Sequence, residues 1–111
     1  MTVPEIAPID AADAIAQGAF LLDVREADEW AAGHAAAATW IALGGIADRV
    51  AEIPADRQVV CICRSGARST KATEFLAARG ITAVNLVGGM QAWAAAGLDV
   101  TTDDGLPGTV I

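Results

Sequence analysis

The sequence predicts an α/β domain in which a mainly parallel sheet carries helices on both faces. Short apolar runs alternate with helical patterns along the 111 residues, and such alternation is typical of parallel sheets. The run from Val59 to Ile62 is apolar at every position, as in a strand that is buried on both faces. A chain of this length accommodates one compact domain.

Apolar runs and turn residues predict the elements in chain order. A helix is expected from Ala11 to Gln17, with Asp10 as its N-cap and Gly18 after its end. Further helices are expected at 27–32, after the glycines 44–45 and through Glu52, at 71–79 and at 90–96. Strands are expected at 20–23, 39–41, 58–62 and 83–86. The last residues are rich in Thr, Asp, Gly and Pro, which predicts an extended or flexible tail at 101–111.

The charge and composition exclude several classes of partner. The net charge of −7 argues against nucleic acid and against anionic membrane surfaces. We expect neither a signal peptide nor a membrane span, because the N-terminus lacks a basic region and no apolar stretch is long enough. The two cysteines lie too close together on one strand to form a disulfide easily, and one histidine adds too few ligands for a metal site. A cytoplasmic location with reduced thiols is therefore expected.

The most informative motif is the loop 63–69, Cys-Arg-Ser-Gly-Ala-Arg-Ser, which joins the strongest strand to a helix. Arg64 and Arg68 supply positive charge, and Gly66 allows the backbone to turn so that N–H groups face inward. The positive end of the following helix dipole adds to this field. All three effects favour the thiolate of Cys63, at the edge of a parallel sheet where ligands bind.

Four other polar or sulfur-bearing residues have a functional and a structural interpretation. Cys61 faces the same side as Cys63 and could resolve a sulfur adduct, but a buried structural cysteine is the interpretation we favour. His34 could act as an acid or base, and we favour a structural hydrogen bond. Asp23 and Arg25 end the second strand, where an ion pair that shapes the pocket is favoured over direct chemistry.

Four motifs in this order resemble the single-domain rhodanese-like sulfurtransferases over about residues 6–100. They are Leu21-Leu22-Asp23-Val24-Arg25-Glu26, Glu29-Trp30 with Gly33-His34, the loop 63–69, and Leu86-Val87-Gly88-Gly89 with Trp93 and Gly97-Leu98. Each motif alone is weak, whereas the four together are highly specific. The resemblance implies a doubly wound rhodanese-like domain at 1–100, with a five-stranded, mainly parallel sheet.

The resemblance further implies that Cys63 is the catalytic nucleophile. Cys63 would take the outer sulfur of thiosulfate or of a persulfide, hold it as a persulfide and pass it to a thiophilic acceptor, either a small molecule or a protein. The loop that cradles this sulfur would consist of Arg64, Ser65, Gly66, Ala67, Arg68 and Ser69. Asp23 and Arg25 would support the site. No cofactor or metal would be needed, because sulfur itself makes and breaks the bonds.

Three alternatives to a sulfurtransferase remain open at this point. One is a persulfide carrier in a protein relay with little turnover of small molecules, and another is a catalytically inactive interaction domain, which the intact loop disfavours. Phosphatases and arsenate reductases that resemble this fold carry Cys-x5-Arg. Here only four residues separate Cys63 from Arg68, and this smaller cradle suits a sulfur atom better than a phosphate.

Two segments depart from the family pattern. The alanines 35–38 stand where Ile-Pro-Gly-Ala is usual, and the loss of proline is expected to leave this segment less constrained. Leu98-Asp99 stands where Leu-Pro is common. Neither departure touches the cysteine loop.

Overall fold

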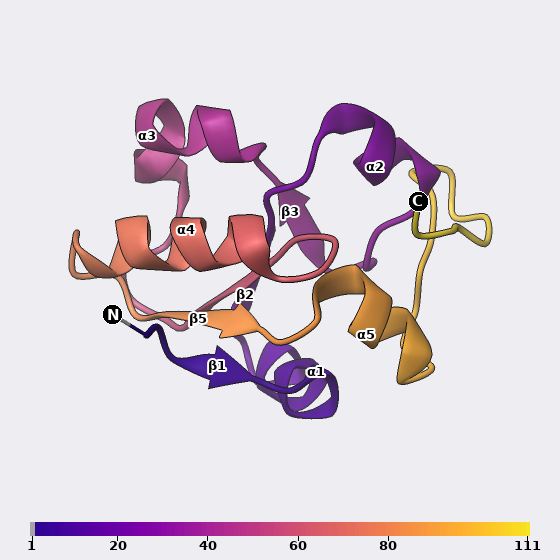
Figure 1. The fold of residues 1–111 in the computed structure, drawn as a ribbon, viewed down its shortest axis with the longest axis horizontal. Coiled ribbons are helices and arrows are strands. Elements are labelled where there is room, and N and C mark those ends of the chain that lie inside the picture. Colours follow the sequence, from indigo (N-terminus) through magenta and orange to yellow (C-terminus); the bar gives the residue numbers. More distant parts are fainter. Residues whose placement is uncertain (1) are drawn as a thin grey trace.

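A computed structural model describes residues 2–111 and contains one parallel sheet in the order β1-β5-β4-β2-β3 (Figure 1). The strands are β1 (Glu5–Ile6), β2 (Phe20–Asp23), β3 (Ala38–Trp40), β4 (Val59–Ile62) and β5 (Ala83–Leu86). The helices are α1 (Pro8–Ala16), α2 (Ala27–Ala32), α3 (Ile46–Arg49), α4 (Ala67–Ala77) and α5 (Gly89–Ala95). The predicted fold class, a five-stranded α/β sheet, is confirmed.

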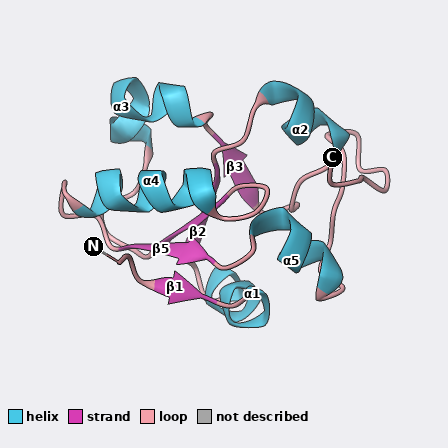
Figure 2. Ribbon diagram, viewed as in Figure 1, coloured by secondary structure: helices cyan, strands magenta, loops and turns pink. Residues whose placement is uncertain are grey.

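Helices cover both faces of the sheet (Figure 2). On one face, Val59 and Cys61 of β4 pack in a core with residues of α3 and α4. On the other face, Val60 and Ile62 pack with residues of α1 and α5. Because successive side chains of a strand point to opposite faces, an apolar residue is needed at every position of β4.

Several helix boundaries differ from the prediction. Helix α1 begins at Pro8 with Ala7 as its N-cap, so Asp10 lies in the first turn and the predicted Asp10 cap is wrong. Proline suits the first helical position because its missing N–H would have no partner there. Helix α4 begins at Ala67, four residues before the apolar pattern starts. The helix expected through Glu52 is divided into 3₁₀ turns on either side of α3.

The segment after α5 folds back onto the carboxyl end of the sheet. Thr101 and His34 exchange two backbone hydrogen bonds of 2.8 Å, and the Thr109 amide donates to the Ala32 carbonyl at 2.9 Å. Val110 packs against the core on the α5 side. This tail, which we expected to be extended or flexible, contains no helix and only isolated bridges, yet it contacts the loop that follows α2.

The two departures from the family pattern meet in space. The Asp99 carboxylate accepts a hydrogen bond from the Ala36 amide at 2.7 Å, and Ala35 is buried. A turn is closed by the hydrogen bond from the Ala38 amide to the Ala35 carbonyl at 3.0 Å. The alanine segment is therefore held by Asp99 and by this turn, although it lacks the proline of the family pattern.

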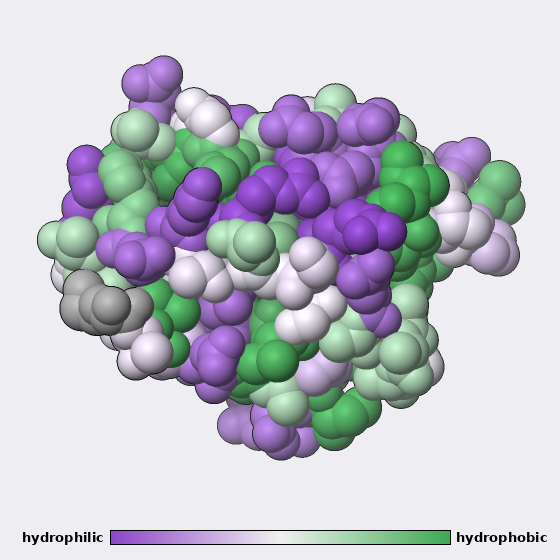
Figure 3. All heavy atoms as spheres, in the orientation of Figure 1, coloured by the Kyte–Doolittle hydropathy of each residue, from purple (hydrophilic) through white to green (hydrophobic). Residues whose placement is uncertain are grey.

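The surface in Figure 3 is hydrophilic over α2 and the beginning of α4. Glu26, Asp28 and Glu29 of the α2 region and Arg68 of α4 supply charge there. Within residues 2–111, no helix has the length and apolar character that a membrane span requires.

Candidate active site

Cys63 lies directly beyond β4, at the carboxyl end of the sheet and before α4 (Figure 1). Its side chain belongs to the core beneath α4, and the residue is only 1% exposed. Gly66 precedes the helix with a φ of 117°, a backbone conformation that other residues rarely adopt. The strand, this turn and the helix start therefore bring the loop back over the sulfur.

Hydrogen-bond donors surround the Cys63 sulfur. The Gly66 amide donates to Sγ at 3.1 Å, and the Ser69 hydroxyl lies 3.3 Å from it. Burial raises the pKa of the Cys63 thiol, but the Ser69 hydroxyl and the amides of Ser69, Gly66 and Ser65 outweigh burial, so that the pKa is lowered. The site therefore favours a thiolate by donating hydrogen bonds to the charged sulfur.

Helix α5 holds the backbone of the loop from the opposite side. The Met90 amide donates to the Cys63 carbonyl at 2.7 Å, and the Gln91 amide donates to the Arg64 carbonyl at 3.1 Å. Gly89 makes this approach possible, because a Cβ at that position would lie 2.6 Å from the carbonyl carbon and oxygen of Arg64. The start of α5 thus fixes the orientation of the first two peptide groups after β4.

Asn85 is a buried polar residue of the site that was not identified from the sequence. Its Oδ1 lies 2.5 Å from Ser69 Oγ, and its Nδ2 donates to Thr70 Oγ1 at 3.0 Å. Asn85 therefore holds the Ser69 oxygen in place, and its Oδ1 competes with the Cys63 sulfur for the single hydroxyl proton. The only signal in the sequence was an amide inside an otherwise apolar strand.

Glu29 of α2 is a second residue that sequence reasoning did not assign to the site. Its two carboxylate oxygens accept hydrogen bonds from Arg68 at 2.6 and 2.8 Å. The hydrogen bond with Arg68 is the main reason that the pKa of Glu29 falls to about 2. Both terminal nitrogens of Arg68 are thus bound by a carboxylate, whereas the resemblance implied that this side chain attracts an anionic donor.

The Arg64 side chain is directed toward the tail and α5. Its Nε donates to the main-chain oxygen of Ile111 at 2.9 Å. With the Gln91 amide oriented so that its oxygen faces the guanidinium, that oxygen accepts from Arg64 at 3.0 and 3.2 Å. The hydrogen bonds that reach the sulfur therefore come from amides and a hydroxyl, and neither arginine side chain donates one to it.

Asp23 and Arg25 form the predicted ion pair, and both side chains are fully buried. Arg25 Nη2 donates to Asp23 Oδ2 at 2.8 Å and to the Gly33 carbonyl at 2.8 Å. The pair thereby joins the end of β2, the neighbour of β4, to the turn after α2. It makes no hydrogen bond to the loop 63–69.

The remaining cysteine and the histidine have structural surroundings. Burial raises the pKa of Cys61 to about 11, so this residue stays a thiol at neutral pH. The His34 ring stacks on Trp30 at 3.5 Å, and its Nδ1 contacts the Trp30 carbonyl at 2.8 Å. Its Nε2 lies 3.3 Å from Asp103 in the tail. These contacts agree with the structural interpretations that we favoured.

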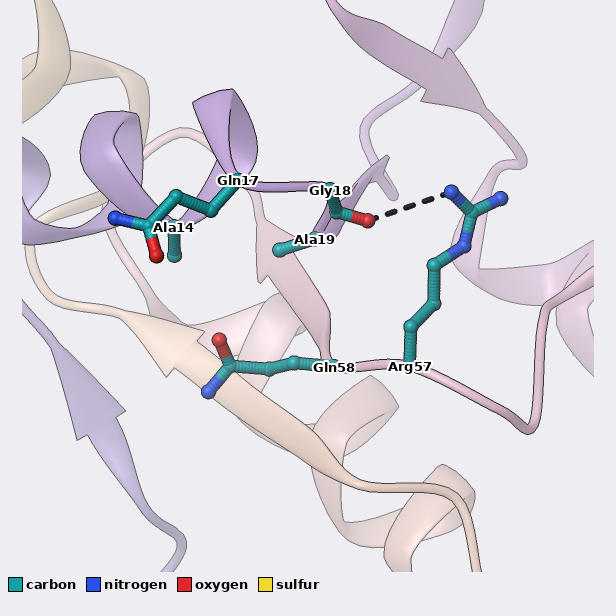
Figure 4. Close-up of a pocket in the computed structure, with 6 residues that line it drawn as sticks. All are labelled: Ala14, Gln17, Gly18, Ala19, Arg57 and Gln58. Atoms are coloured by element: carbon teal, nitrogen blue, oxygen red, sulfur yellow. Dashed lines mark hydrogen bonds between the residues drawn. The ribbon is translucent and has the colours of Figure 1, made fainter.

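A separate hollow of about 280 Å³ lies at the opposite edge of the sheet, where β2 and β4 begin (Figure 4). Arg57 reaches across it to donate a hydrogen bond of 3.3 Å to the Gly18 carbonyl. Its lining is Ala14, Gln17, Gly18, Ala19, Arg57 and Gln58. No thiol, imidazole or carboxylate lines this hollow, so Cys63 remains the centre of the candidate site.

Comparison with known proteins agrees with this arrangement. The family described as rhodanese-like domain matches residues 7–96. A protein named sulfurtransferase from Allochromatium vinosum is 43% identical over 86 residues, covering 77% of this chain and 80% of the relative. The thiosulfate sulfurtransferase GlpE from Pseudomonas entomophila is 30% identical over 89 residues, covering 79% and 82%. A rhodanese-related protein from Thermoplasma volcanium superimposes with a TM-score of 0.84 at 30% identity, covering 90% of this chain and 99% of that one. The chain therefore belongs to the rhodanese-like domain family.

Proposed function

We propose that the protein is a sulfurtransferase that carries sulfane sulfur on Cys63. The observation that supports this best is the ring of donors at Sγ, in which the Gly66 amide and the Ser69 hydroxyl lie at 3.1 and 3.3 Å. These donors lower the pKa of Cys63 against the opposing effect of burial. A thiolate formed in this way needs no general base to become a nucleophile.

The proposed reaction has two balanced steps. The Cys63 thiolate attacks the outer sulfur of thiosulfate or of a persulfide, the S–S bond of the donor breaks, and its electron pair leaves with sulfite or with the donor thiol. A thiophilic acceptor then attacks the outer sulfur of the Cys63 persulfide, and the bonding electrons return to Cys63. Sulfur is exchanged without any further oxidant, reductant or cofactor.

In this proposal, the loop residues 64–69 bind the transferred sulfur through their amides and the Ser69 hydroxyl. The Asp23–Arg25 pair supports the site by fixing the end of β2 beside β4. Phosphatase chemistry is less well supported, because a phosphate would need the guanidinium that Arg68 gives to Glu29. Both cysteines are free thiols, which fits the reducing cytoplasm that we propose as the location.

A persulfide carrier is the second candidate, and the engagement of both arginines favours it. Arg68 is bound by Glu29, and Arg64 is bound by Ile111 and Gln91. Both guanidinium groups thus already have protein partners, which weakens the case for a small anionic donor that binds through them. In a carrier, the sulfur donor and acceptor are proteins, and contacts outside the loop provide the affinity.

A thiosulfate:cyanide assay on wild type, Cys63→Ala and Cys61→Ala tests the proposal. We expect turnover in wild type and in the matched Cys61→Ala control, and its loss in Cys63→Ala. A carrier would show little turnover, yet intact-mass analysis would show the gain of one sulfur atom on Cys63 after mixing with a persulfide. Full activity in Cys63→Ala would contradict both candidates.

A further inference from the structure

We propose that Glu29 determines donor selectivity at Cys63 by neutralising Arg68, which favours singly charged persulfides over doubly charged thiosulfate. This inference rests on the proposed sulfur transfer. It concerns a residue of α2 that makes no hydrogen bond to the sulfur, and it assigns to that residue a role in choosing the donor.

The geometry of the Arg68–Glu29 ion pair indicates that Glu29 neutralises the charge of Arg68. Arg68 is the second residue of α4, directly after the loop, and both of its terminal nitrogens donate to Glu29 at 2.6 and 2.8 Å. The side chains are 33% and 12% exposed for Arg68 and Glu29, so solvent screens the pair only in part. Glu29 is also fixed by the Glu26 amide, which donates to its Oε1 at 3.0 Å. Its depressed pKa keeps it ionised throughout the neutral range.

No other cation takes the place of Arg68. Glu26 and Asp28 add two further negative charges beside Glu29, while Arg64 points toward the tail and α5. The remaining basic residues have other surroundings. Arg25 pairs with Asp23, and Arg49 pairs with Glu52. Arg57 contacts Gly18, Arg79 lies over the Phe75 ring, and Lys71 lines a hollow between α3 and α4. The three acidic residues of the α2 region thus outnumber the two arginines of the loop.

Charge at the loop affects the two donor classes differently. Thiosulfate carries two negative charges to a thiolate, whereas cysteine persulfide carries one, since its ammonium and carboxylate cancel. Because Coulomb energy is proportional to each charge, a freed positive charge stabilises the approach of a dianion about twice as much as that of a monoanion. Neutralisation of Arg68 therefore penalises thiosulfate more than a persulfide.

The test compares the rates at which Cys63 is loaded with sulfur from thiosulfate and from cysteine persulfide. Rates are followed by intact mass in wild type, Glu29→Gln and Asp28→Asn. The side-chain amide in Glu29→Gln can still accept the hydrogen bonds from Glu26 and Arg68 through its oxygen, so the replacement changes charge more than shape. We expect Glu29→Gln to accelerate loading from thiosulfate about tenfold and from cysteine persulfide about threefold at low salt. Asp28→Asn removes an equal charge from the same helix without touching Arg68, and because this side chain is exposed and screened by solvent, it should change the ratio of the two rates much less than Glu29→Gln does.

High salt should reduce the selectivity change in Glu29→Gln, because mobile ions screen the freed guanidinium. The double variant Glu29→Gln/Arg68→Gln restores a neutral pair and should return the ratio to the wild-type value. An unchanged ratio in a Glu29→Gln protein that still loads sulfur on Cys63 overturns the assignment of Glu29. Failure of wild type to accept sulfur from either donor would instead overturn the proposed sulfur transfer itself.

Discussion

The Cys63 sulfur receives hydrogen bonds from groups that are themselves held in place. The Ser69 hydroxyl has one proton and three acceptors within reach, which are Cys63 Sγ, the Gly66 carbonyl and Asn85 Oδ1. A charged sulfur is the strongest competitor for that proton, because hydrogen bonds to ionised groups are the stronger ones. Ionisation of Cys63 therefore turns the Ser69 hydroxyl toward the sulfur.

Replacement of Ser69 by alanine should make Cys63 less reactive near neutral pH. The variant removes a donor that lowers the pKa of Cys63, so the pH midpoint of alkylation rises and the rate at pH 7 falls about three- to tenfold. Iodoacetamide alkylation measured against pH gives the midpoint. Ser65→Ala is the matched control, because Ser65 acts on the thiol through its amide, which the variant retains. Coincident profiles for all three proteins would show that amides alone set the reactivity.

At the residue scale, the sequence was informative about chemistry that is local in the chain. The thiolate loop, the Asp23–Arg25 pair and the structural role of Cys61 all follow from neighbours within a few positions. Glu29 and Asn85 reach the site from other elements, and 39 and 16 positions separate them from Arg68 and Ser69. No local pattern reveals such partners, and for this reason the ion pair of Arg68 with Glu29 was not predicted.

Among the elements, α5 and the cysteine loop form the tightest backbone contact of the site. Gly89 lies in the left-handed region with a φ of 57°, and its missing Cβ leaves room for the peptide between Cys63 and Arg64. Gly97, which follows α5, also has a positive φ of 80°, but a Cβ there would meet nothing within 4 Å. A substitution at Gly97 therefore introduces only backbone strain, whereas the same substitution at Gly89 introduces backbone strain and steric overlap.

Substitution of Gly89 by alanine should destabilise the protein much more than the same change at Gly97. Both variants incur about 1 kcal/mol for a left-handed alanine, and Gly89→Ala adds about 1–3 kcal/mol for the forced displacement of the loop. Urea unfolding measures both free energies, and the alkylation rate of Cys63 reports the loop. Equal losses of stability in the two variants would mean that the loop moves away from the methyl group in Gly89→Ala without a further loss of unfolding free energy.

The bounds of β5 and α2 were predicted to the residue, and those of β4 within one residue. The first turn of α4 was missed because its residues, Ala-Arg-Ser-Thr, show no apolar periodicity and are held by the loop and by Asn85. Strand β1 has two residues and exists through its pairing with β5, so its own sequence carries little signal. Tertiary contacts decide both of these elements.

At the scale of the whole molecule, the tail 101–111 joins parts of the chain that are distant in sequence. We propose 1–100 as the rhodanese-like domain and 101–111 as a strap across its carboxyl end. The strap lies against Gly33, where a Cβ would be 2.6 Å from the backbone of Thr109 and 2.7 Å from Val100 Cγ1. The Gly33 carbonyl also accepts a hydrogen bond from the buried Arg25, so both the strap and the Asp23–Arg25 ion pair contact Gly33.

Gly33→Ala should therefore loosen the strap and lower the free energy of unfolding by about 1–3 kcal/mol. Its extended φ of 167° suits any residue, so the cost comes from overlap alone. Gly44→Ala is the control, since nothing lies within 4 Å of a Cβ there. Limited proteolysis is expected to cut the tail of Gly33→Ala faster than that of wild type. Equal cutting rates and equal stabilities would show that the strap accommodates the methyl group.

The contact between α5 and the loop also affects whether a group bound in the loop must accept or donate hydrogen bonds. The Cys63 and Arg64 carbonyls are taken by amides of α5, and the Gly66 carbonyl is taken by Thr70 and Ser69. The carbonyl oxygen of each of these peptide groups already accepts a hydrogen bond within the protein. The N–H is therefore the part of the peptide group that can bind a ligand. A sulfur species whose lone pairs accept hydrogen bonds fits these N–H groups. A group that must donate a hydrogen bond finds no unoccupied acceptor among these three carbonyls. The backbone of the loop therefore presents hydrogen-bond donors, and not acceptors, to a bound group.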